Sequence, residues 1–212
     1  KYPKESLYKM MKEKFKMTDD DFRHYDGSIG MEKIELTNCP VRLEQKHIDA
    51  LKEIVGEKYM RTDDYARVSV AYGKTAYDAM RLREKRLDSL PDAVVYPAKT
   101  EEVEAIVAYC TKEKIPLYVY GGGSSVTMGV EPVNGGISLD MRFNEVVSFN
   151  ETDQTITVQA GMSGPKLEKI LNNAQTVFGA GRAYTCGHFP QSFEYSSVGG
   201  WVVTRGAGQN ST

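Results

Sequence analysis

The sequence predicts a mixed fold of helices and strands, organised around one strand–helix–strand unit. Residues 91–97 have the apolar, proline-bounded composition of a buried strand, and residues 116–120 have that of a second strand. Between them, residues 100–113 carry a helical stripe of apolar side chains at i, i+3, i+4 and i+7, namely Val103, Ile106, Val107 and Cys110. Further short strands are expected at 136–140, 145–149 and 155–160.

Two helices of this region have recognisable starts. Thr100 is expected to be the N-cap of the first helix, with two glutamates in its first turn. Cys110 lies on the buried stripe of that helix, so it is interpreted as a core residue and not as a nucleophile. After the last short strand, Gly161 turns the chain and Ser163 caps a second helix, whose buried stripe is Leu167, Ile170 and Leu171.

Residues 1–64 predict a helical N-terminal segment that precedes a domain over residues 65–212. Helices are expected over 6–16 and 45–55, the second of them ending at Gly56. Thr18, followed by three aspartates, indicates another helix start. His24 and His47 have no partner at metal-ligand spacing, so both are interpreted as surface or structural residues, and no metal site is expected.

A connector over residues 61–90 joins the segment to the strand–helix–strand unit. Residues 67–70 alternate like a short strand that ends before Gly73. Residues 75–85 predict a short helix, with its anchoring side chains expected at Tyr77, Met80 and Leu82.

Composition excludes several classes of protein. The chain has 212 residues, of which 41% are hydrophobic and 26% charged, with a net charge of −2. These values predict no nucleic-acid partner, and no apolar run approaches the roughly 20 residues that a membrane span needs. The three cysteines fit neither a disulfide framework nor a zinc site, which favours a reducing, cytoplasmic location. Because residues 209–212 follow a glycine-rich apolar stretch without a closing element, we expect a longer polypeptide.

Three consecutive glycines follow the strand at 116–120. Such a run lets the backbone turn sharply, and its N–H groups can form a concave anion site to which Ser124 and Ser125 add hydroxyls. A glycine-rich loop without a ligand would have the same sequence, so both interpretations stay open. The doubly wound dinucleotide fold does not fit, because the loop follows the second strand and no clear helix follows the loop.

A second segment, residues 190–208, has similar properties. It is rich in small and hydroxyl-bearing residues ahead of an expected helical turn, and a helix start offers free N–H groups to an anion. Two segments of this kind, about 70 residues apart, favour a shared phosphate ligand.

The order of these motifs resembles a known family. A Pro-Asp-x-Val-Val-x-Pro strand, a helix, Gly-Gly-Gly-x-Ser-Val, Ser-Leu-Asp-Met and Ser-Ser-Val-Gly-Gly-Trp-Val-x-Thr-Arg follow one another along the chain. They resemble the FAD-binding domain of the vanillyl-alcohol oxidase and p-cresol methylhydroxylase superfamily, most of all the alkyldihydroxyacetonephosphate synthase branch and its bacterial FAD-linked oxidase relatives. The resemblance covers about residues 65–212.

The resemblance implies an α+β fold in which two subdomains clamp an extended FAD. A cap domain that forms most of the substrate pocket would lie beyond Thr212, together with the catalytic residues. Gln191 stands where the family has an acidic residue. The implied cofactor-binding residues are Val119, Tyr120, Gly121, Gly122, Gly123, Ser124, Ser125, Gln191, Ser192, Phe193, Glu194, Tyr195, Ser196, Ser197, Gly199, Gly200, Thr204, Arg205, Gly206 and Ala207.

Two of the larger side chains have alternative roles. Arg205 can add charge to the cofactor site or form a salt bridge at the helix end. Trp201 is expected to pack between subdomains, the alternative being that it stacks on the flavin. Some members of the superfamily tether FAD through a histidine near the first glycine loop, whereas no histidine lies between Lys99 and Gly187 here. We therefore expect non-covalent FAD.

Three candidate functions follow, the first two implied by the resemblance and the third by the glycine loop alone. The first is an exchange of an acyl for an alkyl group on a dihydroxyacetone phosphate ester, mediated by flavin N5. The second is oxidation of a 2-hydroxy acid, of the D-lactate or glycolate type, or of an alcohol, with electrons passed to an acceptor partner. The third is a non-catalytic nucleotide-binding module. A small-molecule substrate and a homo-oligomer are expected for the enzyme.

Overall fold

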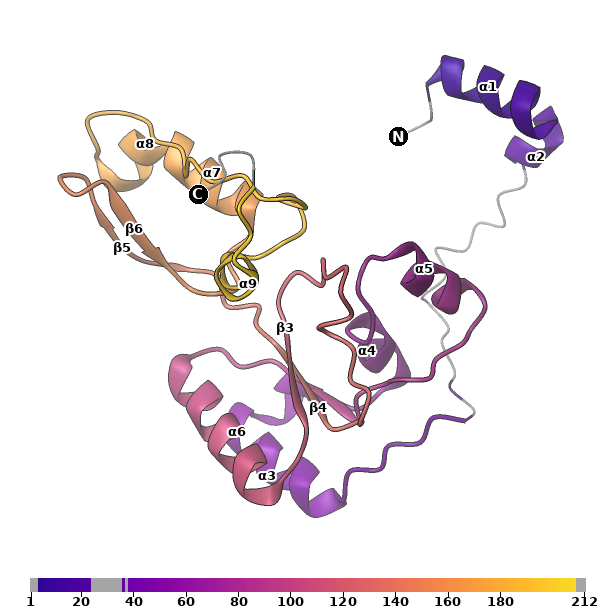
Figure 1. Cartoon of the computed structure of the whole chain (residues 1–212). Helices are drawn as coiled ribbons and strands as arrows, with labels where there is room; N and C mark the ends of the chain where they lie inside the picture. Colours follow the sequence, from indigo (N-terminus) through magenta and orange to yellow (C-terminus); the bar gives the residue numbers. More distant parts are fainter. Residues whose placement is uncertain (1–3, 24–35, 37, 209–212) are drawn as a thin grey trace. The chain divides into compact units, whose positions relative to one another are not determined.

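The computed structural model describes residues 4–23, 36 and 38–208, and the chain forms two compact units, Lys1–Ile34 and Glu35–Thr212 (Figure 1). The first unit contains α1 (Glu5–Phe15) and α2 (Asp19–Arg23), which confirms the helices expected there. The Tyr8 ring packs edge-on against Phe22, with ring centroids 4.7 Å apart. Thr18 donates from its backbone N–H and its hydroxyl to the Asp21 carboxylate at 2.6 and 2.9 Å. His24 lies outside the described residues.

The second unit is built on a four-stranded sheet with the order β1-β2-β4-β3. Its strands are β1 (Met60–Arg61), β2 (Ala93–Val95), β3 (Leu117–Tyr120) and β4 (Ile137–Asp140). β2, β4 and β3 run parallel, whereas β1 pairs antiparallel with β2 after a short 3₁₀ turn, Glu57–Tyr59. Helix α6 (Thr100–Glu113) joins β2 to β3, which confirms the strand–helix–strand unit, and β4 inserts between its two strands.

Helices α3 (Gln45–Val55) and α6 cover one face of this sheet (Figure 1). Leu51 and Val55 from α3 pack with Ile106 and Cys110 from α6 against alternate strand residues, Ala93, Val95, Ile137 and Leu139. Burial raises the pKa of the Cys110 thiol to about 11, so this cysteine is an inert core residue, as the sequence predicts. His47 is also buried, with Nδ1 2.8 Å from the Tyr109 hydroxyl, which confirms a structural role.

Two details of α6 differ from the sequence-based expectation. Thr100 is the first helical residue and not the N-cap, which is Lys99 and makes no side-chain cap bond. The Glu102 carboxylate instead accepts a hydrogen bond from the Ala98 N–H at 2.8 Å, so the helix start is stabilised from inside the first turn. Val107, which the apolar spacing assigned to the buried stripe of α6, is exposed, whereas Ile106 and Cys110 are buried.

The opposite face of the sheet is covered by α4 (Asp64–Ser69), where a strand over residues 67–70 was expected. That expectation is wrong. The Asp63 carboxylate caps the helix by accepting from the Ala66 N–H at 3.1 Å. The buried Arg67 then donates to the carbonyls of Pro91 and Cys39 at 2.7 and 2.9 Å. Four alternating residues fit a helix end and a strand equally well, and these long-range bonds decide between them.

Helix α5 (Ala76–Arg83) lies where the sequence predicts, but its anchors are different residues. Thr75 and Asp78 form a reciprocal capping box. The expected anchors Tyr77, Met80 and Leu82 are 46, 53 and 38% exposed, whereas the buried residues of this helix are Asp78 and Arg81. Polar contacts, and not an apolar stripe, hold α5 in place.

Within the described residues, the rest of the second unit is a hairpin followed by three helices (Figure 1). Strands β5 (Val146–Asn150) and β6 (Thr155–Val158) pair antiparallel, and α7 (Gly164–Asn172), α8 (Ala174–Phe178) and α9 (Val198–Thr204) follow. Their core contains Met162, Leu167, Leu171 and Trp201. The Trp201 ring stacks on Phe193 at 5.7 Å and its Nε1–H donates to the Ser196 hydroxyl at 2.6 Å. Trp201 is therefore a packing residue, and these contacts lie within this one part of the unit.

Among the described residues, no helix combines the length and the apolar character that a membrane crossing requires.

Asp92 at the start of β2 provides a stability prediction. Its buried carboxylate accepts from the backbone N–H groups of Arg42 and Gly136, both at 2.7 Å. Replacing Asp92 with Ala leaves both donors unpaired, and we expect the free energy of unfolding to fall by about 2–4 kcal/mol in urea titrations. The exposed Asp49→Ala variant is the control, with an expected change within about 0.5 kcal/mol. An Asp92→Ala midpoint equal to that of the unmodified chain would contradict this account.

Candidate cofactor-binding site

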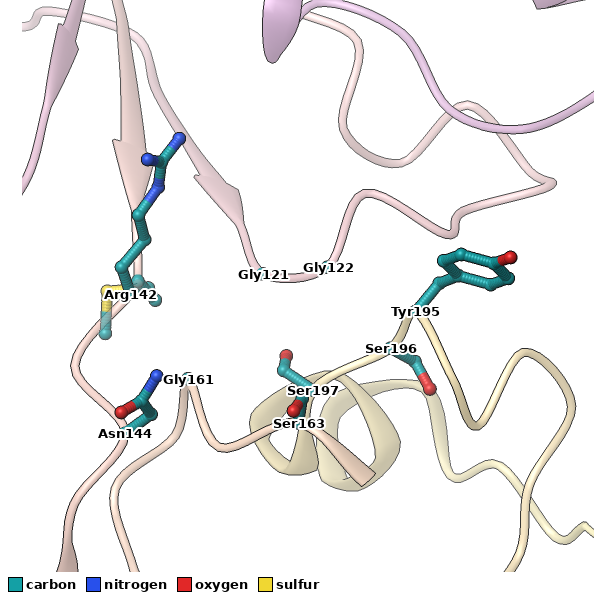
Figure 2. Close-up of a pocket in the computed structure, with 10 residues that line it drawn as sticks. Gly121, Gly122, Arg142, Asn144, Gly161, Ser163, Tyr195, Ser196 and Ser197 are labelled. Atoms are coloured by element: carbon teal, nitrogen blue, oxygen red, sulfur yellow. The ribbon is translucent and has the colours of Figure 1, made fainter. Parts of the chain in front are cut away.

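The glycine run after β3 comes very close to a segment more than 70 residues further along the chain (Figure 2). A Cβ atom added to Gly122 would lie 1.8 Å from the Tyr195 carbonyl oxygen, and one added to Gly121 would lie 2.4 Å from the Ser197 hydroxyl. No other residue type fits at either position without displacing backbone or side chain. The two segments predicted to meet therefore do meet, and they meet through glycine.

The wall that faces the glycines is made of two chain segments joined to each other. Ser163 and Ser197 form an isolated antiparallel bridge. The Val198 N–H donates to the Met162 carbonyl at 2.8 Å, and the Gly199 N–H donates to the Ala160 carbonyl at 2.9 Å. A Cβ on Gly199 would lie 2.9 Å from Ala160, so this glycine permits the close packing of α9 on residues 160–162.

A pocket of about 190 Å³ lies between the glycines and this wall (Figure 2). Its volume is below the roughly 300–1,000 Å³ of ordinary ligand pockets, so it can hold a fragment of a dinucleotide and not the whole. The lining residues are Gly121, Gly122, Met141, Arg142, Asn144, Gly161, Ser163, Tyr195, Ser196 and Ser197.

The glycine loop contains unpaired donors, and two of its residues, Gly121 and Gly122, line the pocket. No described residue accepts a hydrogen bond from the backbone N–H groups of residues 121–124. Four consecutive free N–H groups form a donor set suited to a diphosphate, which is a dianion that accepts several hydrogen bonds. The donor chemistry and the tight glycine cradle therefore fit the diphosphate of FAD.

The start of α9 does not offer the free N–H groups that the sequence predicts. Val198 and Gly199 donate to residues 162 and 160, as described above, and the Gly200 N–H donates to the Ser197 hydroxyl at 3.4 Å. The expectation of free N–H groups at this helix start is wrong, because those donors join two segments of the wall. What the wall offers a ligand is hydroxyl groups, at Ser163 and Ser197.

Ser125 shapes the loop. Its hydroxyl accepts from the Gly129 N–H at 3.1 Å, and its carbonyl accepts from the Lys74 N–H at 2.8 Å. Tyr120 contributes in a similar way, since its hydroxyl donates to the Ser69 carbonyl at 3.3 Å and its ring fills the space beside Gly123, whose φ is +64°.

Arg142 is the one charged residue among those that line the pocket, and it was not expected from the sequence. Its Nε donates to the Asp140 carboxylate at 2.7 Å, and its guanidinium lies 4.9 Å from the centre of the Tyr96 ring. In Figure 2 its side chain points away from the two glycines. Burial raises the pKa of Asp140, whose Oδ1 is buried without a hydrogen-bond partner.

The other lining residues that sequence reasoning missed are Met141, Asn144, Gly161 and Ser163. Gly161 and Ser163 had been interpreted as a turn and a cap, and their position directly after a strand end was the available signal. Met141 and Asn144 follow β4 in the same way.

The remaining predicted residues lie outside this pocket. Ser192 has φ +59°, and its carbonyl accepts from the N–H groups of Tyr195 and Ser196, both at 2.8 Å. Phe193 packs on Trp201, while Gln191 and Glu194 are exposed. The Thr204 hydroxyl donates to the Gly200 carbonyl at 2.8 Å, inside its own helix.

Arg205 and Gly206 border a second hollow of about 320 Å³, which His188, Val198, Trp201 and Val202 also line. Arg205 forms no ion pair with the described residues, so the alternative of a helix-end salt bridge has no support there. Ala207 is exposed next to this hollow. Within the described part of the chain, no group of three His, Cys, Asp or Glu residues could hold a metal ion.

Comparison with known proteins agrees with this geometry. The family model described as "FAD binding domain" matches residues 91–212. Alkyldihydroxyacetonephosphate synthase of Dictyostelium discoideum is 32% identical over 81% of this chain and 29% of its own length. The glycolate oxidase subunit GlcD of Bacillus subtilis is 28% identical over 63% of this chain and 26% of its own length.

Solved structures show the same relationship. A structure of alkyldihydroxyacetonephosphate synthase covers 84% of this chain and 32% of its own, with a TM-score of 0.75 and 31% identity. A structure of p-cresol methylhydroxylase covers 64% and 26%, with a TM-score of 0.50 and 16% identity, and shows the fold alone. The chain thus spans about a third or less of the relatives that it matches. It has the α+β fold expected from its sequence, and it belongs to the FAD-binding domain family, whose cofactor is FAD.

Proposed function

We propose that this chain holds FAD non-covalently and is the cofactor-binding part of an enzyme similar to alkyldihydroxyacetonephosphate synthase. The observation that carries the proposal is the run of unpaired N–H groups at residues 121–124, opposite a wall with two serine hydroxyls. Backbone donors bind a diphosphate without a buried lysine or a metal ion.

Each part of the site has a task in this proposal. The N–H groups of residues 121–124 hold the diphosphate, and the hydroxyls of Ser163 and Ser197 donate to it from the opposite side. The close Gly122–Tyr195 contact fixes the width of the gap, so the donors stand ready before binding. Arg205 and Gly206, which border the second hollow, are proposed to contact another portion of the cofactor. When bound, FAD supplies the ring whose N5 carries the chemistry of such enzymes.

The reaction proposed for the whole protein is exchange of the acyl group of a dihydroxyacetone phosphate ester for an alkyl group. Synthase relatives support it through higher identity and wider coverage than the glycolate oxidase subunit shows. The oxidase relative keeps a second candidate open, the oxidation of a 2-hydroxy acid with transfer of electrons to a partner. We also propose a cytoplasmic location, because the free cysteines Cys39, Cys110 and Cys186 suit a reducing compartment.

The close contact of Gly122 with Tyr195, which we call the glycine cradle, provides a first prediction. In Gly122→Ala the new methyl group would collide with the Tyr195 carbonyl, so the loop has to shift and its donors lose their alignment. We expect the Kd for FAD, measured by flavin fluorescence titration, to rise at least about 10-fold, which corresponds to about 1.4 kcal/mol. Gly129→Ala is the matched control in the same loop, because its Cβ meets nothing closer than 3.7 Å. Equal Kd values for Gly122→Ala and the unmodified chain would refute the cradle.

Non-covalent binding makes a second prediction. The chain has three histidines, of which His47 is buried against Tyr109 and none lies in the glycine loop. Acid denaturation followed by filtration is expected to release all yellow colour into the filtrate. Colour that stays on the polypeptide would show a covalent bond instead.

A third experiment, on the full-length enzyme, distinguishes the acyl-for-alkyl exchange from the oxidation of a 2-hydroxy acid. We expect D-lactate or glycolate to leave the flavin absorbance unchanged under anaerobic conditions. We also expect a fatty alcohol to replace the acyl group of acyl-dihydroxyacetone phosphate in a product assay. Prompt bleaching of the flavin by either acid would favour the oxidase.

A further inference from the structure

The loop over residues 121–131 contains no helix or strand, and it is held in position by two contacts of its own with residues 69–81 and by a third from Tyr120, directly before it. We call residues 69–81 the α5 bracket. It comprises the end of α4, the Thr75 cap and most of α5. The bracket precedes β2 in the chain, outside the residues that the family model matches.

The first two contacts hold the beginning and the middle of the loop. The Tyr120 hydroxyl donates to the Ser69 carbonyl at 3.3 Å, directly before the glycines. The Lys74 N–H donates to the Ser125 carbonyl at 2.8 Å, and Gly73 allows this approach, because a Cβ there would lie 2.2 Å from the same oxygen. The N–H groups of residues 121–124 thus lie between two fixed points.

The third contact is a buried ion pair at the end of the loop. Arg81 Nη2 lies 2.7 Å from Glu131 Oε1, and the two side chains are only 4 and 8% exposed. The guanidinium also lies 4.4 Å from the centre of the Tyr72 ring. The hydrogen bond from Arg81 holds the pKa of Glu131 below its usual value, so the carboxylate is charged at neutral pH. Removing Arg81 would leave the Glu131 carboxylate buried without its ion-pair partner, whereas Arg81 also lies 3.8 Å from Asp78 and 3.6 Å from Asp88.

Two of these contacts act on the loop itself, whereas Tyr120 belongs to β3, and Val70 of the bracket packs with Val94 of β2. The two buried residues of α5 are Asp78 and Arg81, both charged, so this helix adds no buried apolar side chain to a core. Asp78 caps its own helix, whereas Arg81 reaches the residue that ends the loop. A loop whose donors are ordered before binding loses less conformational freedom when the ligand arrives.

We propose that the α5 bracket is a positioning element for the cofactor loop and that Arg81 and Glu131 are its positioning pair. The inference rests on the proposed function, because it takes the loop to be the one that holds the diphosphate. Arg81 acts through the loop and does not itself touch the cofactor.

The test compares two buried arginines in the full chain. Arg81→Lys cannot reproduce both the Glu131 bond and the contact with the Tyr72 ring. Arg67→Lys is the matched control, because Arg67 is equally buried but binds the carbonyls of Pro91 and Cys39. Both variants are expected to melt at lower temperature than the unmodified chain. Only Arg81→Lys is expected to raise the Kd for FAD, by about 10-fold or more, at a temperature where both are folded.

Amide hydrogen exchange in the absence of FAD provides the second readout. The Lys74 amide reports the contact with Ser125, and the Glu131 amide reports the turn that ends in the pair, since it donates to the Met128 carbonyl at 3.0 Å. Both are expected to exchange at least about 10-fold faster in Arg81→Lys and to be unchanged in Arg67→Lys. If Arg81→Lys fails to fold, Glu131→Gln takes its place.

The outcomes separate the two proposals. Unchanged exchange and unchanged Kd in Arg81→Lys would overturn the positioning role, as would equal losses in both variants. If the unmodified chain fails to bind FAD, the proposed function falls, and the exchange of Lys74 and Glu131 alone then decides whether the bracket positions the loop.

Discussion

The contact on which this structure depends is the approach of Gly122 to the Tyr195 carbonyl, at a distance that leaves no room for a Cβ atom. Two parts of the second unit, the four-stranded sheet and the hairpin with its helices, meet there backbone to backbone. A side chain at this point would separate them and widen the pocket. In the same run, the N–H groups of residues 121–124 have no acceptor among the described residues, so the glycines that permit the contact also belong to the donor set.

The two walls of the pocket contribute different chemistry. The glycine wall has unpaired N–H groups, whereas the serine wall has used the N–H groups of Val198, Gly199 and Gly200 to join its own segments. Those bonds make the serine wall rigid and leave hydroxyls as its polar groups. Arg142 is the only charged residue in the lining, and it is already paired with Asp140. An anion bound in this pocket would therefore be stabilised mostly by the dipoles of backbone N–H groups and serine hydroxyls.

Local sequence patterns predicted the long helices correctly. They gave wrong predictions where contacts with residues far along the chain determine the secondary structure or the burial of a side chain. The bounds of α3 and α6 match the apolar stripes of 45–55 and 100–113, because an amphipathic stripe of three turns or more is specific. The four residues 67–70 carry too short a pattern, and bonds from Arg67 to Cys39 and Pro91 make them the end of a helix. Burial of Arg81 could not be predicted either, since its partner Glu131 lies 50 residues further on.

In the site, too, some features could be predicted from local sequence and others depend on distant contacts. The glycine run and the segment 190–208 were recognisable together, because two stretches rich in small residues and hydroxyls in one chain favour a shared phosphate ligand. That the α9 donors are occupied depends on residues 160–162, which no local pattern connects with residues 198–200. In a doubly wound fold, one strand, loop and helix supply the whole phosphate site. Here the loop after β3 and the wall at α9 belong to different parts of the unit, so neither segment forms the site alone. In the proposed site, the alignment of these two segments is therefore as necessary for FAD binding as the donors themselves.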